Sequence, residues 1–203
     1  MKRRRQLGRP ASQALDNRLI EAALGLVEET QSFDGLSVDA ICRRAQSSKA
    51  SFYRRWPDRE TFILATMDRL RPAPLPQGET PSLRQDLISM LDSMFGADVR
   101  RTRIVHAALI AEGRRNRGLK DRYLAEIVQP RRDMLIDRLS TAVANGTLSQ
   151  DSDIQLLYEM LTAPVLKLVL MADPDAPVPP GFIERLVDQA LRGLIRPNPA
   201  KNT

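Results

Sequence analysis

Residues 45–60, AQSSKASFYRRWPDRE, constrain the fold more than any other stretch of the sequence. They contain too few aliphatic residues for a core helix, yet they carry the capping residues that are typical of ordered helices. Ser47 or Ser48 can cap a short helix, and Asp58 can cap the helix that follows it. A second short helix is predicted just before, at about 38–44. Two short helices joined by a tight turn, the second of them small, polar and basic, predict a helix-turn-helix.

A helix this short is unstable alone, so neighbouring helices must hold it in place. We expect the anchors to be Val38, Ile41, Phe52 and Trp56. The opposite face is then free to enter the major groove of DNA, which admits one helix. Small side chains at its tip allow close approach to base edges, and Lys49 can donate to guanine O6 and N7, while the tyrosine and arginines suit phosphate. The DNA-binding residues predicted on this basis are Arg44, Ser47, Ser48, Lys49, Ser51, Tyr53, Arg54 and Arg59.

The distribution of charge also favours a polyanionic partner. The net charge is +6, and residues 1–71 carry 14 Lys/Arg and 9 Asp/Glu, while residues 72–203 carry 17 and 16. A localised positive field of this kind attracts nucleic acid. The alternative is a solvated basic tail beside an ordinary helix face. The arginine runs at 100–103 and 114–117 are expected to be solvated helix faces or interhelical ion pairs.

Apolar residues recur at helical spacing along most of the chain, and strand alternation is absent. We expect an all-α fold with about nine helices. The proline-rich stretch RPAPLPQGETP is the clearest linker, and Pro130 is expected to kink or split a long helix at 117–144. The predicted organisation is a disordered basic arm at 1–11, a helix-turn-helix domain at 12–71, a linker at 72–81, a helical effector-binding and dimerisation domain at 82–196, and a tail at 197–203.

The second domain offers an apolar pocket and apolar stripes on its last two helices. Each side chain named for either role could instead be plain core. A pocket among the middle helices would be lined by Met90, Met94, Phe95, His106, Ile110, Tyr123, Ile127, Tyr158 and Leu161. A symmetric dimer interface would use Leu157, Leu161, Val165, Leu168, Phe182, Ile183, Leu186, Val187, Ala190, Leu191 and Leu194.

The sequence gives little support for an enzymatic function. It has no phosphate-binding loop, no GxSxG, no HExxH and no CxxC, and its one histidine and one cysteine fall in different predicted domains. We therefore expect no enzymatic activity, no cofactor and no metal. The basic N-terminus is not followed by an apolar stretch, so no signal peptide is predicted. Cys42 is the only cysteine, which fits a reducing cytoplasm.

The segment DGLSVDAICRRAQSSKASFYRRWPDRETF resembles the DNA-binding signature of TetR/AcrR transcriptional regulators. The motif combines an alanine, a serine-lysine pair, Tyr53, a second aromatic residue at Trp56, then Pro57, an N-cap and Glu60 at set spacing. The later stretches EGRRNRGLKDRYLAEIVQPRRDMLIDRL and IQLLYEMLTAPVLKLVLM…FIERLVDQALRGL resemble ligand domains of one subgroup. The resemblance covers nearly the full chain, strongly over 12–70 and more weakly after 80.

The resemblance implies a dimeric regulator that binds a palindromic operator in double-stranded DNA and is released by a small molecule. It places Ser48, Lys49 and Ser51 in the groove, and phosphate contacts at Ser37, Tyr53, Arg54 and Arg59. Two other classes stay open: a DNA-binding regulator whose second domain serves only dimerisation or a protein partner, and a helical interaction module with a solvated basic face.

The turn departs from the family pattern at Gln46, where the family usually has glycine. A left-handed non-glycine residue there costs roughly 1 kcal/mol. The alternative is a turn of different conformation, which would alter the angle between the two helices.

Overall fold

A computed structural model describes residues 9–70 and 82–192, and within these ranges it contains helices and no strand. This confirms the predicted all-α fold class. Most of the predicted arm at 1–11, the linker at 72–81 and the interface residue Leu194 lie outside the described residues. No helix within the described ranges is long and apolar enough to cross a membrane.

The chain divides into two compact units. The first comprises Met1–Leu70 with Ile104–Asp121, and the second comprises Arg71–Arg103 with Arg122–Thr203. One boundary between the units lies between Leu70 and Arg71, where the proline-rich segment of the sequence begins. The sequence did not indicate that Ile104–Asp121 joins the first unit.

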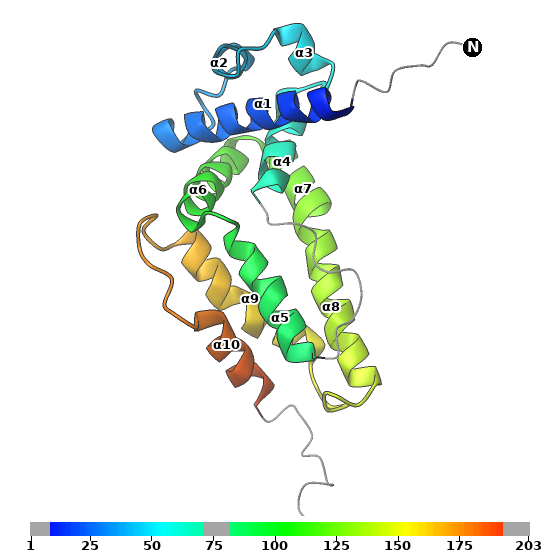
Figure 1. Ribbon diagram of the computed structural model, residues 1–203. Coiled ribbons are helices and arrows are strands. Elements are labelled where there is room, and N and C mark those ends of the chain that lie inside the picture. The colour runs from blue at the N-terminus through cyan, green and yellow to red at the C-terminus, as the bar shows by residue number, and fades with distance from the viewer. Residues whose placement is uncertain (1–8, 71–81, 193–203) are drawn as a thin grey trace, which may run out of the picture. The chain divides into compact units, whose positions relative to one another are not determined.

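The first unit is built around α1, which packs against both α2 and α4, while α2 packs against α3 (Figure 1). Leu19, Ala23 and Val27 of α1 are fully buried at the predicted helical spacing. Burial of a leucine or phenylalanine of this kind contributes about 1.5–3 kcal/mol. The helices of this unit are α1 (Arg9–Thr30), α2 (Val38–Arg44), α3 (Lys49–Tyr53), α4 (Arg59–Arg69), most of α6 (Val99–Arg115) and most of α7 (Arg117–Tyr123).

Side-chain caps begin the three helices of the predicted DNA-binding segment. Ser37, Ser48 and Asp58 each accept a hydrogen bond from the backbone N–H three residues later, at 3.1, 3.2 and 2.6 Å. Each cap satisfies a backbone donor that the helix cannot, which contributes about 1 kcal/mol. The predicted starts of these helices are therefore confirmed, with Ser48 rather than Ser47 as the cap of α3.

The turn between α2 and α3 keeps the left-handed conformation although its residue is not glycine. Gln46 has φ +50°. The N–H of Ser47 donates to the carbonyl of Cys42 at 2.8 Å, and the N–H of Gln46 donates to that of Arg43 at 3.3 Å. These two bonds form a Schellman motif, the ordinary helix ending built around one left-handed residue. Gln46 therefore leaves the turn intact, at a conformational cost of about 1 kcal/mol.

The second unit is a bundle in which α5 packs against α8, α9 and α10, and α9 packs against α8 and α10. Leu87, Leu91, Leu139, Leu161 and Val165 form its fully buried centre. Its helices are α5 (Leu83–Asp92), the 3-10 turn η1 (Ser93–Phe95), the first residues of α6, the π-helical segment η2 (Leu124–Val128), α8 (Gln129–Ala144), α9 (Ile154–Leu170) and α10 (Phe182–Leu191).

The interruption predicted at Pro130 takes the form of the π-helical segment η2. The N–H of Gln129 donates to the carbonyl of Leu124, five residues earlier. Proline has no N–H and cannot bond the carbonyl four residues before it, and that carbonyl, of Glu126, lies inside η2. The wider turn thus falls where regular helical bonding would fail.

Arg103 is 2% exposed although it carries a charge. Its guanidinium donates to the carbonyls of Leu168, Asp173 and Pro174 at 2.9, 3.0 and 3.3 Å, and also to that of Ala176. These bonds fasten the loop after α9 to the start of α6. The expectation that its arginine run is a solvated face or a set of ion pairs is wrong for Arg103.

Candidate nucleic-acid interface

α3 is anchored to the first unit by Phe52, whose ring packs against the rings of Trp56 and Phe62. Phe52 is fully buried, and its ring centroid lies 5.5 Å from that of Trp56 and 4.8 Å from that of Phe62. Trp56 and Phe62 lie 4.8 Å apart in an edge-on arrangement. Such pairs add about 0.5–1.5 kcal/mol beyond their burial. Phe52, Trp56 and Ile41 are buried as predicted, whereas Val38 is only partly buried.

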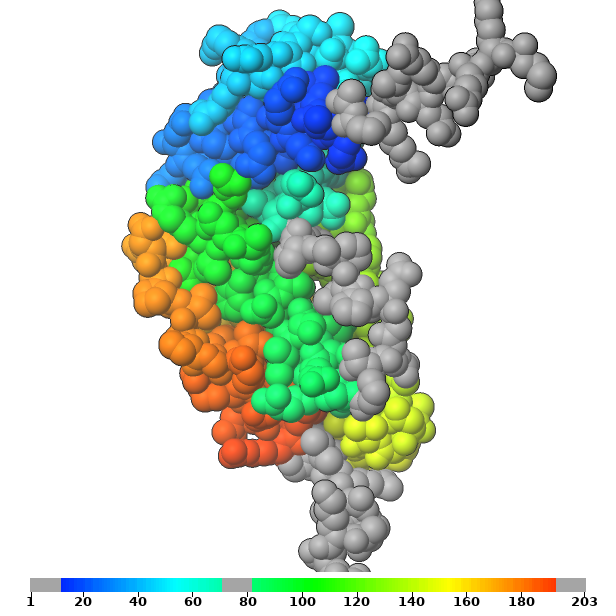
Figure 2. Space-filling model, viewed as in Figure 1, coloured from blue at the N-terminus to red at the C-terminus, as the bar shows by residue number. Residues whose placement is uncertain are grey.

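The opposite side of α3 is open and carries the predicted reading residues. Ser48, Lys49, Ala50, Tyr53 and Arg54 are all exposed. Figure 2 shows α2 and α3 (light blue to cyan) next to each other on an outer surface of the first unit. This face therefore presents small polar side chains, a lysine and a basic end to whatever approaches it.

The predicted groove-facing serines also hold one another. The Oγ of Ser48 caps α3 and donates to the Oγ of Ser51 at 3.1 Å. Ser47 and Ser51 are partly buried. The hydroxyl face of α3 is thus fixed before any ligand binds.

The amino group of Lys49 lies 2.7 Å from the carboxylate of Asp39 in the first turn of α2. The hydrogen bond to Asp39 raises the pKa of Lys49 above its ordinary value. The lysine is therefore charged at every physiological pH, and it already has an acidic partner in the free protein. Asp39 was not among the predicted site residues.

Two of the predicted DNA-binding arginines are bonded within the protein. The guanidinium of Arg44 donates to both carboxylate oxygens of Glu29, at 2.7 and 2.8 Å. The guanidinium of Arg59 donates to the carbonyls of Phe33 and Leu36 at 2.5 and 3.3 Å. A phosphate contact by either arginine would have to replace these bonds. Arg54, in contrast, is exposed at the end of α3.

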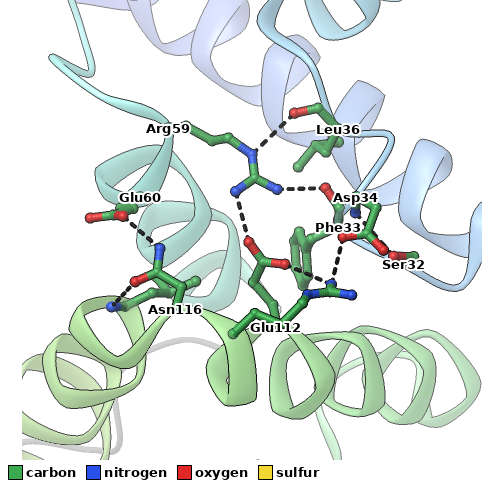
Figure 3. A network of polar contacts seen from close by, with 10 residues as sticks. Ser32, Phe33, Asp34, Leu36, Arg59, Glu60, Glu112 and Asn116 are labelled. Atoms are coloured by element: carbon green, nitrogen blue, oxygen red, sulfur yellow. Dashed lines mark hydrogen bonds and ion pairs between the residues drawn. The ribbon is translucent and has the colours of Figure 1, made fainter.

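Arg59 belongs to a network that joins three segments of the first unit (Figure 3). Its guanidinium also donates to Glu112 of α6 at 2.9 Å. The other carboxylate oxygen of Glu112 accepts from Arg115 at 2.9 Å, and Arg115 lies 2.5 Å from Asp34. The network ties the loop between α1 and α2, the start of α4 and the end of α6 together.

A neighbouring contact extends this connection. The side-chain amide of Asn116 donates to Glu60 of α4 at 2.6 Å, and its oxygen accepts from the N–H of Leu119 in α7 at 3.0 Å. Asn116 therefore caps α7 while it bonds α4 (Figure 3). These contacts fix the helix that supports α3 from a segment far along the chain.

Glu112 is a buried acid that stays ionised. Burial alone would raise the pKa of its carboxyl, but the hydrogen bonds from Arg59 and Arg115 outweigh it and hold the pKa below its ordinary value. Glu112 is 7% exposed, so neutralisation of its carboxylate would deprive two guanidinium groups of a nearly buried charged acceptor.

The predicted pocket residues fall into both units. Phe95 and Leu161 are buried in the core of the second unit, with Met90, Met94 and Tyr158 packed against that core. Tyr123 and Ile127 also belong to the second unit, whereas His106 and Ile110 belong to the first. Five of the nine side chains are thus gathered in one cluster.

Most of the predicted interface side chains are buried inside their own chain instead. This outcome corresponds to the alternative that the stripes are plain core. The seven that are at most 5% exposed are Leu157, Leu161, Val165, Ile183, Val187, Ala190 and Leu191. Leu168, Phe182 and Leu186 are partly buried. The outward face of α9 is mixed: it exposes Leu156, Met160, Ala163 and Leu166 among the polar residues Gln155, Glu159 and Lys167.

Sequence reasoning missed several polar residues that organise the site. Asp39 is not among the residues predicted for the site, and Glu112 and Asn116 lie in a stretch assigned to the other domain. Their partners are 53 to 56 positions away in the chain, so no local pattern reveals them. A buried acid between arginines on an otherwise apolar helix face is the one available signal.

Two family models match the chain. The model described as bacterial regulatory proteins of the tetR family matches residues 19–66. The model described as the tetracyclin repressor-like C-terminal domain matches residues 78–190.

Individual proteins agree with these matches. The chain is 26% identical to the uncharacterized HTH-type transcriptional regulator YdeS of Bacillus subtilis over 92% of this chain and 93% of that protein. It is 28% identical to the DNA-binding transcriptional repressor TetR of Mycobacteroides abscessus, over 81% and 86%. The crystal structure of the TetR family transcription regulator SCO0332 has the same fold, with a TM-score of 0.60, 24% identity and coverage of 89% and 98%.

Proposed function

Because the chain belongs to the TetR family of bacterial regulatory proteins, we propose that it is a dimeric transcriptional repressor released by a small-molecule effector. It is a DNA-binding regulator, and the exposed face of α3 is the part that enters the major groove. The observation that carries this assignment is the separation of faces on α3. Phe52 is fully buried on one side, while Lys49 and Arg54 are exposed on the other.

The roles along this face differ. Lys49 and the serines lie at the start of α3, where a helix in the groove meets base edges, so they would specify sequence. Tyr53 and Arg54 lie at its other end and would bind phosphate. Arg44 and Arg59 act differently: their bonds to Glu29 and to the network around Glu112 make them positioning residues that hold α2 and α4.

Recognition of a palindrome requires two copies of α3, one for each half-site. The outward face of α9 supports a symmetric interface, because Leu156 and Met160 are 56% and 48% exposed on a helix whose other side is core. Isolated exposed apolar residues are ordinary, but Leu156, Met160 and Ala163 follow one another at helical spacing, which favours a contact surface, with Glu159 and Lys167 as polar neighbours. The partly buried Phe182 and Leu186 of α10 would extend it.

The effector would bind in the second unit, near the cluster of Met90, Met94 and Tyr158 beside the core. Methionine side chains adapt to ligands of varied shape. Binding would release DNA only if the effector has different affinities for the DNA-binding conformation and for another one. α6 contributes residues to both units, and its Glu112 end is bonded to α4.

Footprinting of the full-length protein on the DNA upstream of its own gene tests the proposal. We expect protection of an inverted repeat whose halves lie about one helical turn apart, or a multiple of it. Addition of small molecules should then release the footprint for one chemical class. A footprint that no small molecule releases would favour a second unit that serves only dimerisation or a protein partner.

A further inference from the structure

An acidic side chain stands on the face that approaches DNA. The carboxylate of Asp39 and the ammonium group of Lys49 are 2.7 Å apart, and the two side chains are 63% and 57% exposed. A carboxylate near a phosphate backbone weakens binding by repulsion. An exposed ion pair contributes little stability, so stability gives no strong reason for it.

The pair presents a donor and an acceptor side by side. In the major groove, guanine shows two acceptors, O6 and N7, and cytosine shows its 4-amino donor. O6 and the 4-amino group are themselves joined by an N–H···O bond of about 2.9 Å. The edge of a G·C pair therefore offers an acceptor beside a donor at nearly the spacing of the Lys49–Asp39 pair, with the opposite polarity.

An A·T pair matches less well. There the ammonium group would meet only thymine O4, beside the thymine methyl group. The carboxylate would meet the adenine 6-amino group, but adenine N7, an acceptor, lies next to it and repels the carboxylate. Only the G·C pair offers Lys49 two acceptors on one base and offers Asp39 a donor without a competing acceptor beyond it.

We propose that Asp39 and Lys49 together read one G·C base pair of the operator, with Lys49 donating to guanine O6 and N7 and Asp39 accepting from the cytosine 4-amino group. This inference rests on the proposed function. At an A·T pair the adenine amino group comes with the repelling N7 beside it, and in the reversed pairs the carboxylate faces an acceptor, so each of these mismatches costs affinity. Asp39 thus acts as a specificity-determining residue that weakens binding to wrong sequences.

The test begins with selection of bound sequences from a random duplex pool by the full-length protein. In the enriched site, the cytosine of the candidate pair is replaced by 2-pyrimidinone, which lacks the 4-amino group. The wild type should lose about tenfold in affinity, as for a hydrogen bond to a charged group. Asp39→Ala should lose less than about twofold on the same change, because it has no acceptor there. Both proteins are compared on identical duplexes, so the weaker base pair itself cancels.

Asp68→Ala is the matched control, since Asp68 is an exposed acid of the same unit on α4. It should lose about tenfold like the wild type. Replacement of the guanine by 7-deazaguanine should likewise weaken the wild type and leave Lys49→Ala unaffected.

Each result decides a different point. Failure to enrich any sequence would overturn the proposed function itself. An enriched site in which wild type and Asp39→Ala respond equally to 2-pyrimidinone would overturn only the present inference, and would leave Asp39 as a helix-dipole partner of α2. A uniform gain of affinity for all sequences in Asp39→Ala, without that difference in response, would have the same meaning.

Discussion

The carboxylate of Glu112 in α6 accepts a 2.9 Å hydrogen bond from the guanidinium of Arg59 in α4, although the two residues are 53 positions apart in the sequence. The same guanidinium bonds the carbonyls of Phe33 and Leu36, just before α2 begins. One arginine thus connects the loop that precedes α2 to a helix that the sequence assigns to a different domain. The connection holds α4, whose Phe62 packs against Phe52 of α3.

Glu112→Gln should destabilise the protein by about 1–3 kcal/mol, because two guanidinium groups lose a charged acceptor in a nearly buried place. Urea unfolding followed by circular dichroism measures this. Glu126→Gln is the control, since Glu126 pairs with Arg122 on an exposed helix face. This substitution should lower the free energy of unfolding by about 0.5 kcal/mol or less. Equal small effects of both changes would show that the network contributes no stability.

The contribution of Glu112 should depend on pH in one direction. Its pKa in the folded protein lies below the ordinary value of 4.5, so the unfolded chain takes up the proton first as pH falls. The stabilisation is therefore complete above about pH 4.5 and is lost as pH falls through the folded pKa. The stability difference between wild type and Glu112→Gln should be constant near neutrality and shrink in acid. A difference that grew in acid would contradict the assigned direction.

Gln46→Gly should stabilise the protein by roughly 0.5–1 kcal/mol. The left-handed conformation at φ +50° is strained for glutamine and free for glycine, while the gain is reduced by the greater freedom of glycine in the unfolded chain. Gln13→Gly, an exposed position inside α1, is the opposite control and should destabilise by about 1 kcal/mol. Midpoints of urea unfolding give both signs, and destabilisation by Gln46→Gly would show that the turn is held differently.

Lys49→Ala and Arg54→Ala should weaken DNA binding in different ways. Loss of Lys49 should cost about 1–3 kcal/mol on the selected site and relax the preference at one base pair. Loss of Arg54 should weaken selected and random duplexes alike and lower the salt slope by about one charge. Titrations at several salt concentrations on both duplexes separate the two. Normal binding of the selected site by Lys49→Ala would remove Lys49 from the reading face.

Met160→Glu should break the dimer, because it places a charge between Leu156 and Ala163, the exposed apolar residues through which α9 would contact its partner. Met134→Glu on α8 is a matched control, since the two methionines are 48% and 46% exposed. Light scattering should give the mass of one chain for Met160→Glu and of two for the control. A dimer that survives Met160→Glu would place the interface on another surface.

Local signals in the sequence predicted the helices well. Ser37, Ser48 and Asp58 act within three residues of themselves, so their caps can be derived without any fold. The same holds for the aromatic anchors Phe52 and Trp56, which sit at fixed spacing on α3 and just after it. The left-handed turn at Gln46 was one of two alternatives, and only the backbone decides between them.

What the sequence could not predict depends on distant partners. The sequence predicts Arg59 to bind phosphate, because it is basic and follows an N-cap. In the structure its guanidinium instead donates to Phe33, Leu36 and Glu112. On α9 large apolar residues lie on both faces, so hydrophobicity alone cannot tell Leu161, which is fully buried, from Met160, which is half exposed. Only the packing of neighbouring helices settles which face is core.

The ratio of affinities for the selected palindrome and for a scrambled duplex of the same composition, at physiological salt, tests the central claim most directly. A regulator that reads sequence through α3 should bind the palindrome at least about 10³-fold more tightly, with two chains bound per duplex. Equal affinity for the two duplexes would contradict the account, because the basic face would then bind DNA only as a polyanion.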